Sequence, residues 1–114
     1  MIIKTEDLAD IHEEGYPLVM KKVVHREHHG NAISVTWVKI WGHHKKMVCD
    51  DSDRVYYIIE GKGEFRVGDD PPGRVDPGDF VFIPRGVPYV FDGHMKYLVM
   101  NGPAFLPGSD RVLE

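Results

Sequence analysis

The sequence predicts an all-β protein, either an antiparallel sandwich or a barrel, and three observations support this. Short runs rich in Val, Ile, Tyr and Phe recur along the chain, each ending at a turn sequence. No apolar pattern with helical spacing extends beyond a single turn. The 12 glycines and 8 prolines gather at the breaks between the runs. Many short strands at this spacing are typical of jelly rolls and barrels.

The first elements are expected before residue 42. Thr5 followed by acidic residues predicts one capped helical turn near the start of the chain. Residues 19–26 and 32–41 are then predicted strands. The sequence His-His-Gly-Asn at 28–31 predicts a tight hairpin between them, since Gly and Asn can take the positive φ angles that such a turn needs.

The later strands are expected between glycine and proline breaks. They are predicted at residues 54–60, 64–67, 80–83, 89–91 and 96–100. The segments that separate them carry the glycine and proline residues of turns. The chain is therefore expected to be one domain over residues 1–114, with a core barrel at about 33–103 and a short N-terminal extension.

Composition excludes several classes of function. With 114 residues and a formal net charge of -4, the chain lacks the basic surface of a nucleic-acid binder. No apolar run is long enough to cross a membrane, and the first ten residues do not resemble a secretory signal. The one cysteine, Cys49, has no partner within the chain. A cytoplasmic location is therefore expected.

Residues 78–89 resemble the second sequence motif of the cupin superfamily. In that motif a glycine is followed after five residues by Pro-x-Gly, and then after two residues by a metal-binding histidine. Gly78, Pro84 and Gly86 keep this spacing, but Tyr89 stands at the histidine position. Gly93 stands where the family has asparagine. The resemblance implies a jelly-roll barrel, the double-stranded β-helix of cupins, with Tyr89 pointing into it.

Residues 57–63 resemble the strand that ends the first cupin motif, with Gly61 as its last glycine. Counting back from Gly61 puts Arg54 at the family's glutamate and Cys49 and Met47 at its two histidines. Residues 101–105 also resemble the family's exit strand and tail. The likeness covers about two thirds of the chain, but the metal ligands of the family are replaced.

The replacements argue against a metal at the usual cupin site. Cupins bind metal through imidazoles and a carboxylate, whereas a guanidinium has no lone pair to offer and repels a divalent ion. We therefore predict no cofactor. The alternative is a divalent ion (Fe, Mn, Ni or Zn) held by a non-standard set that includes His43 and Cys49, since the strand period of two places His43 on the face of Met47 and Cys49.

An inward-facing Arg54 requires a partner for its charge, and two interpretations stay open. The first is an internal carboxylate from Glu64 or from a rim aspartate at position 50, 51 or 53. The second is the carboxylate or phosphate of a bound molecule, with Tyr89 donating a further hydrogen bond. Tyr56 shares the strand face of Arg54. The predicted ligand pocket consists of Met47, Cys49, Arg54, Tyr56 and Tyr89.

Two other groups of residues have alternative interpretations. The histidines at positions 25, 28 and 29, next to Glu27, are close enough to bind a metal at the hairpin tip, but a polar turn facing water is favoured. Trp37 and Trp41 share one strand face, where they either pack the barrel core or form a wall for a ligand, and core packing is favoured.

Three functions are compatible with this sequence. The first is a metal-free cupin that binds a small polar or anionic organic molecule as a sensor, carrier or accessory protein. Cupins of the ethanolamine-utilisation type also depart from the histidine pattern. The second is a small metal-dependent enzyme, namely a sugar-phosphate isomerase or epimerase, or a dioxygenase. The third is a non-catalytic barrel used for self-association, and a homodimer through the edge strand at residues 19–24 is expected.

Overall fold

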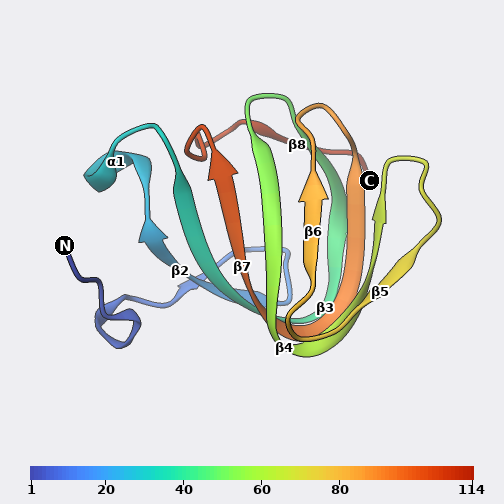
Figure 1. The fold of residues 1–114 in the computed structure, drawn as a ribbon, viewed down its shortest axis with the longest axis horizontal. Helices are drawn as coiled ribbons and strands as arrows, with labels where there is room; N and C mark the ends of the chain where they lie inside the picture. The colour runs from blue at the N-terminus through green and yellow to red at the C-terminus, as the bar shows by residue number, and fades with distance from the viewer.

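The computed structural model describes residues 1–114 and contains one antiparallel β-barrel (Figure 1). Its strands are β1 (Ile11–His12), β2 (Leu18–Val24), β3 (Ser34–Cys49), β4 (Asp53–Val67), β5 (Gly73–Val75), β6 (Phe80–Ile83), β7 (Tyr89–Gly102) and β8 (Asp110–Val112). The helical segments are the short turns η1 (Thr5–Asp7) and α1 (Arg26–His29). The prediction of an all-β jelly-roll barrel is confirmed.

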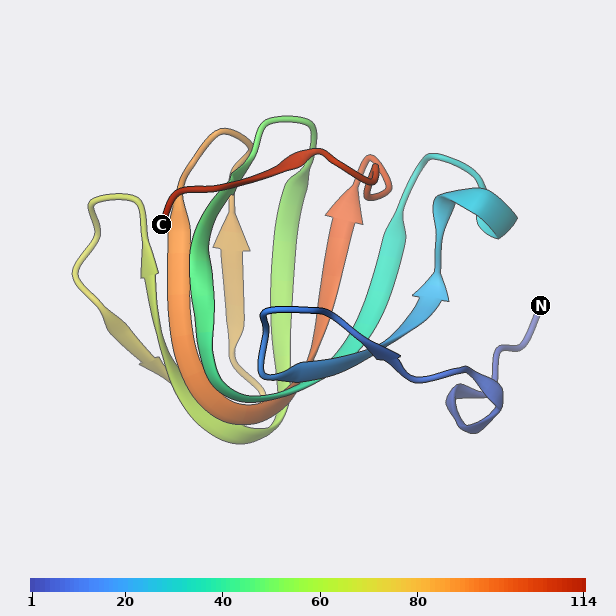
Figure 2. The same ribbon diagram turned by 180° about the vertical axis from the view of Figure 1, so that it is seen from behind.

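Eight strands form a single sheet that curls around the core. The order is β1-β2-β3-β7-β4-β5, with β6 paired to β4 and β8 paired to β3. All pairs are antiparallel. The three long strands β3, β4 and β7 bend through the barrel floor, and β7 lies between the other two and pairs with each of them along most of its length (Figure 1). Segment β8 crosses over the upper ends of these strands (Figure 2).

The predicted breaks at residues 61–63 and 92–93 are wrong, because β4 and β7 run through them without interruption. The glycines at these positions let the two strands bend and do not end them. Gly61 has a φ of 84°, and a Cβ built on it would lie 2.1 Å from the carbonyl oxygen of His94. A Cβ on Gly63 would lie 2.6 Å from the carbonyl oxygen of Asp92. Glycine is therefore required where the two long strands bend closely against each other.

The predicted hairpin at residues 28–31 is also wrong. The strand β2 ends at Val24, and the chain then forms the helical turn α1 before β3 begins at Ser34. The carbonyls of His25 and Arg26, at the start of this turn, accept its backbone hydrogen bonds. Gly30 ends this turn with a φ of 91°, so its conformational freedom is used to end a helix rather than to form a two-residue hairpin. Near the start of the chain, η1 forms at Thr5 but makes no side-chain cap hydrogen bond.

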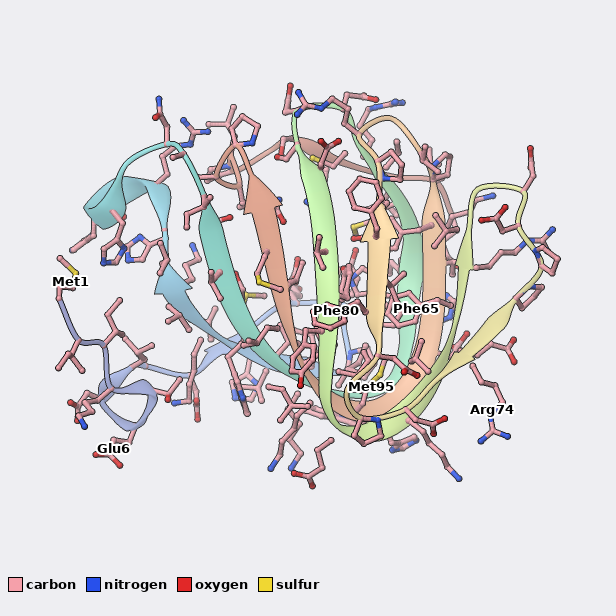
Figure 3. All side chains as sticks on the ribbon, in the orientation of Figure 1. Met1, Glu6, Phe65, Arg74, Phe80 and Met95 are labelled. Atoms are coloured by element: carbon pink, nitrogen blue, oxygen red, sulfur yellow. The ribbon has the colours of Figure 1, made fainter.

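The core lies inside the curled sheet and is rich in aromatic rings. Phe65 and Phe91 stack with their ring centroids 4.3 Å apart, and Tyr56 packs edge-on against both. Phe65 and Met95, each 4% exposed, project from the curved sheet into this interior (Figure 3). No helix in the structure is long and apolar enough to cross a membrane.

Trp37 and Trp41 do not belong to this core. Trp37 pairs in register with Leu98, which pairs with Tyr57, and Tyr57 pairs with the exposed Phe80 of β6. Paired residues of neighbouring strands share a face of the sheet, so Trp37 lies on the outer face. Trp41, two full periods further along β3, is 44% exposed. The expectation of core packing for the tryptophans is therefore wrong.

Candidate functional site

A cavity of about 440 Å³ opens into the barrel. It is lined by side chains of β2, β3, β4 and β7 together with residues 11–14, Phe105 and Asp110. Four of the five predicted pocket residues line it, namely Met47, Arg54, Tyr56 and Tyr89. The volume falls in the range of small-molecule sites, roughly 300–1,000 Å³.

Arg54 is the centre of a buried polar network within this cavity. It is 4% exposed, and its Nη1 donates a hydrogen bond of 2.7 Å to the Tyr89 hydroxyl. The Tyr56 hydroxyl lies 2.8 Å from that of Tyr89. Burial raises the pKa of both phenols, so both are neutral hydrogen-bonding groups at physiological pH. As the strand period of two predicts, Arg54 and Tyr56 lie on the same face of β4, the one that lines the cavity. Tyr89 of β7 lies beside them.

The charge of Arg54 is balanced by Asp110. Arg54 Nη2 lies 2.9 Å from Asp110 Oδ1, and the aspartate side chain is 24% exposed. Desolvation opposes the charge of Arg54, but the neighbouring oxygens of Tyr89, Tyr56 and Asp110 outweigh it and raise the Arg54 pKa. An internal carboxylate is thus the partner of Arg54, although β8 supplies it and the sequence did not point to Asp110.

The predicted partners of Arg54 are engaged elsewhere. Asp53 accepts hydrogen bonds from Arg85, Asp50 pairs with Arg111, and Asp51 is exposed. Glu64 lies on the outer surface in register with Asp92. The predictions of Glu64 and the rim aspartates at 50, 51 and 53 as the partner are therefore wrong.

Asn101 supplies an unused donor in the cavity. Its Oδ1 accepts a hydrogen bond of 3.1 Å from Arg54 Nε, which fixes the amide orientation. The Nδ2 group is buried without any hydrogen-bond partner, and the residue is 5% exposed. A buried unpaired amide donor is costly, and Asn101 lines the cavity, so it is a group that an acceptor atom of a ligand would satisfy.

His44 also lines the cavity, and the sequence reasoning missed it. A β-bulge is the reason. His44 pairs with Phe91, and Met47 pairs with Tyr89. Between these two pairs β3 advances by three residues while β7 advances by two. The extra residue reverses the alternation, placing His44 inside and His43 outside. The adjacent pair of histidines was the available signal, but the bulge within residues 45–46 has no sequence signature.

The His44 imidazole is buried and neutral. Burial lowers its pKa from 6.5 to about 4. Its Nδ1 lies 3.0 Å from the carbonyl oxygen of Lys45, which places the proton on Nδ1. The lone pair then belongs to Nε2, which has no partner in the structure. The ring stacks on Phe91 at 4.4 Å, so its orientation is fixed. A rigid neutral imidazole of this tautomer can accept a proton.

Cys49 and His43 do not join the site. Cys49 is buried, but it is absent from the cavity wall, and its Sγ lies 3.8 Å from the hydroxyls of Ser52 and Ser109. The prediction of Cys49 as a pocket residue is therefore wrong. The His43 side chain is 46% exposed and contacts Asp92 and Glu114. His43 and Cys49 thus lie in different environments, and the structure does not bring them together.

The residues at the usual cupin metal position do not fit a divalent ion. Arg54 Nη1 lies 2.7 Å from the Tyr89 oxygen and 3.9 Å from Met47 Sδ. The guanidinium therefore fills the space between the two side chains that stand at histidine positions of the family. Its permanent positive charge repels a second cation there.

A second hollow lies outside the barrel. It measures about 630 Å³ and is lined only by glycine and by polar side chains, including Lys62, Glu64 and Arg74. Arg74 points away from the barrel body in Figure 3. Because these side chains are exposed and the lining contains no hydrophobic residue, the barrel cavity is the better candidate for small-molecule binding.

One curated relative shares a short stretch with the chain. No protein-family model matches this chain. Dimethylsulfoniopropionate lyase DddQ of Ruegeria pomeroyi is 42% identical over 38 residues, which is 33% of this chain and 19% of that protein. The chain thus spans about a fifth of the length of this relative.

Several solved structures match almost the whole chain. Pac13 of Streptomyces, described as a unique nucleoside dehydratase, has a TM-score of 0.85 at 16% identity, covering 100% of this chain and 91% of that one. Variants of Pac13 with a tyrosine changed to phenylalanine, or a histidine to glutamine, were solved with uridine.

Two further structures agree on the architecture. KdgF from Halomonas sp. has a TM-score of 0.80 at 14% identity, with coverage of 92% and 94%. Oxalate decarboxylase from Bacillus subtilis has a TM-score of 0.82 at 14% identity, and the match covers 96% of this chain but 31% of that one. Pac13, KdgF and oxalate decarboxylase all have the cupin fold. The predicted resemblance is therefore confirmed, and the chain is a cupin-fold protein.

Proposed function

We propose that this protein binds a small, uncharged, polar organic molecule in the barrel cavity, with Arg54 in the place of a metal ion. The observation that carries the proposal is the Nδ2 group of Asn101, which is buried without a hydrogen-bond partner on a residue of the cavity wall. Beside it, the phenols of Tyr56 and Tyr89 and the guanidinium of Arg54 form one connected polar network. Polar groups that converge beside apolar and aromatic side chains in one cavity are typical of a small-molecule site.

The charges around the cavity favour a neutral ligand over an anion. Its charged lining comprises two cations, Lys22 and Arg54, against the three carboxylates Glu13, Glu14 and Asp110. An anion would have to displace Asp110 from Arg54 and approach the other two carboxylates. We therefore narrow the predicted polar or anionic ligand to a neutral one.

A nucleoside fits this description and is the class that we propose. Hydroxyl and carbonyl groups of a nucleoside would accept from Asn101 and exchange hydrogen bonds with Tyr56 and Tyr89. Its flat base would pack against aromatic walls such as Tyr97 and Phe105. The structural similarity to Pac13, a nucleoside dehydratase whose variants were solved with uridine, supports this choice.

A second candidate function is an acid–base reaction of the bound molecule. It is favoured by His44, which lines the cavity and whose Nδ1 is engaged with the Lys45 carbonyl, so that Nε2 is the atom that would accept a proton from the bound molecule. The neutral phenol of Tyr89 is the matching proton donor. The similarity to a dehydratase and the short match to a lyase favour an elimination over other reactions.

Calorimetric titration with uridine, with uracil alone and with uridine monophosphate tests the binding proposal. We expect saturable binding of uridine and weaker binding of the phosphorylated form. Asn101→Leu should weaken binding by about tenfold, since one hydrogen bond in a closed pocket is lost. Glu64→Gln, on the outer surface, is the control and should leave the affinity unchanged. Tighter binding of the monophosphate than of uridine would contradict the neutral-ligand proposal.

The reaction is tested separately. Incubation with nucleosides, followed by mass spectrometry, would detect the loss of water from the substrate. His44→Gln should abolish turnover while uridine binding is retained. If the wild-type protein binds nucleosides and none is converted, the protein is a binding module and the second candidate fails.

A further inference from the structure

Two histidines and a glutamate meet at the helical turn α1, outside the barrel cavity. The donor atoms of His25, Glu27 and His28 all lie within 4.8 Å of one another. The rings of His25 and His28 have centroids 4.7 Å apart. No other group of three or more His, Cys, Asp or Glu side chains in the chain gathers this closely. None of the three lines the barrel cavity.

The local backbone holds these three side chains in place. The amides of His28 and His29 both donate to the carbonyl oxygen of His25, which closes the turn. The His25 amide donates to His29 Nδ1 at 3.0 Å, so the His29 ring serves as a brace. One turn of helix therefore brings positions 25 and 28 to the same side, as the spacing of three residues requires.

A second anchor joins α1 to the barrel. Arg26 Nη2 donates a hydrogen bond of 2.8 Å to the carbonyl oxygen of Ala104, in the segment that follows β7. Ala104 is 1% exposed, and its amide donates to the Asn31 carbonyl. The turn is thus tied at both of its ends to a buried segment, which limits the reorganisation that a ligand would require.

Two imidazole nitrogens and one carboxylate oxygen form a donor set with a clear preference. Imidazole suits Zn, Ni and Cu, whereas Mg²⁺ and Ca²⁺ require oxygen donors. Three protein ligands and a water in the fourth position form the usual arrangement of an open zinc site. In the histidine turn, defined as residues 25–29, Glu27 also supplies the charge that offsets part of the charge of the ion.

We propose that His25, Glu27 and His28 form a site for a divalent transition-metal ion, with zinc as the natural occupant. The ion binds to the outside of the barrel at α1, which the Arg26 hydrogen bond already ties to the segment around Ala104. Because the unfolded chain does not hold the three donors together, ion binding stabilises the folded turn. The proposal is independent of the proposed function of the barrel cavity, since the two sites share no residue.

Zinc titration of tag-free, chelator-treated protein tests the site. Calorimetry should show one equivalent of Zn²⁺ bound, no binding of Mg²⁺, and a higher thermal midpoint with Zn²⁺ present. His28→Ala and His25→Ala should each weaken zinc binding by at least about tenfold. Glu27→Gln should weaken it as well. The matched control is His94→Ala, which removes an exposed histidine outside the histidine turn and should change nothing.

The position of the ion is checked by NMR. The ring resonances of His25 and His28 should shift or broaden on titration with Co²⁺, and those of His12 and His94 should not. Circular dichroism shows whether each variant keeps the β spectrum of the parent. Absence of a saturable zinc equivalent, or equal zinc affinity in His28→Ala and in the parent, would overturn the proposal.

Discussion

Arg54 and Asp110 lie 56 positions apart in the sequence, yet Nη2 of the first is 2.9 Å from Oδ1 of the second. The pair joins the middle of the barrel wall, strand β4, to the short strand β8 that crosses over its end (Figure 2). Removal of either side chain leaves a charge without its partner in a largely buried place. The pair therefore couples the stability of the barrel to the position of β8.

The first prediction concerns the cost of breaking this pair. Arg54→Ala should lower the free energy of unfolding by about 3 kcal/mol, since it leaves Asp110 unpaired and deprives Tyr89 and Asn101 of a donor. Urea denaturation measures the loss. The double variant Arg54→Ala/Asp110→Ala should be less destabilised than the sum of the two single variants. Additive losses would show that the ion pair contributes no coupling.

The second prediction concerns acid stability. Burial lowers the His44 pKa from 6.5 to about 4, so between these pH values the unfolded chain binds a proton that the folded protein does not. Stability is therefore full above pH 6.5 and falls as the pH decreases toward 4. At about 1.4 kcal/mol per pH unit, the loss from this residue amounts to about 3 kcal/mol.

Urea denaturation at several pH values across this window measures the slope, and His44→Gln should flatten it. His43 acts in the opposite direction. The carboxylates of Glu114 and Asp92 raise its pKa, so its contribution is present in acid and disappears as the pH rises through the raised value. Because His43 is intact in both proteins, the difference between them isolates His44. Equal slopes for parent and variant would contradict the buried, neutral state of His44.

The third prediction concerns a grafted metal site. The triple substitution Met47→His, Arg54→Glu and Tyr89→His restores cupin-type ligands around native His44 and leaves Cys49 unchanged. We expect this variant to bind Co²⁺ with a visible absorption spectrum, because all four positions line the barrel cavity. The same triple variant carrying His44→Gln should bind Co²⁺ more weakly. Equal spectra would show that His44 does not belong to the ligand set.

The fourth prediction concerns self-association, and we propose a homodimer. The strand edge predicted at residues 19–24 is only half open, because β1 pairs with Val19 and Met20. The outer face of β6 is the better surface. Phe80 and Phe82 are 67% and 58% exposed, which amounts to about 250 Å² for rings of this size. Together with the half-buried Tyr57, they make this outer face a substantial apolar patch for a second copy.

Sedimentation velocity at micromolar concentration should therefore show a dimer. Phe80→Asp/Phe82→Asp should convert it to a monomer without loss of the β spectrum, whereas Lys22→Asp at the β2 edge should leave the dimer intact. If the dimer persists in Phe80→Asp/Phe82→Asp but is lost in Lys22→Asp, the interface lies at the β2 edge and not on β6. A monomeric parent protein would contradict the proposal.

Much of the fold was predictable because turn residues and strand composition act locally. The spacing of Gly78, Pro84 and Gly86 predicted the position of β6 and the inward direction of Tyr89, and both agree with the structure. The continuity of β4 and β7 was not predictable in this way. A glycine in the sequence is compatible with a turn and with a sharp bend in a continuous strand. At Gly61 the close approach of the partner strand β7 requires the bend, and this contact is not visible in the sequence.

The site was predictable only where alternation is regular. Between Arg54 and Tyr56 the period of two holds, so both residues were placed correctly on one face. Between His44 and Met47 the bulge adds one residue, and the same reasoning put the wrong histidine inside. Asn101 and Asp110 were missed for another reason, since both are far from Arg54 in the sequence. Asn101 lies opposite Arg54 through the pairing of β4 with β7, and Asp110 reaches it from β8.

The outward position of the two tryptophans decides how this protein can be observed. Because Trp37 and Trp41 face away from the barrel interior, light absorbed by tryptophan reports on the outer surface and not on what fills the cavity. The interior has its own chromophores in Tyr56, Tyr89 and Tyr97, all buried. Tyrosine absorbance and emission are therefore the optical signals of an occupied barrel, while a shift in tryptophan emission indicates association between surfaces.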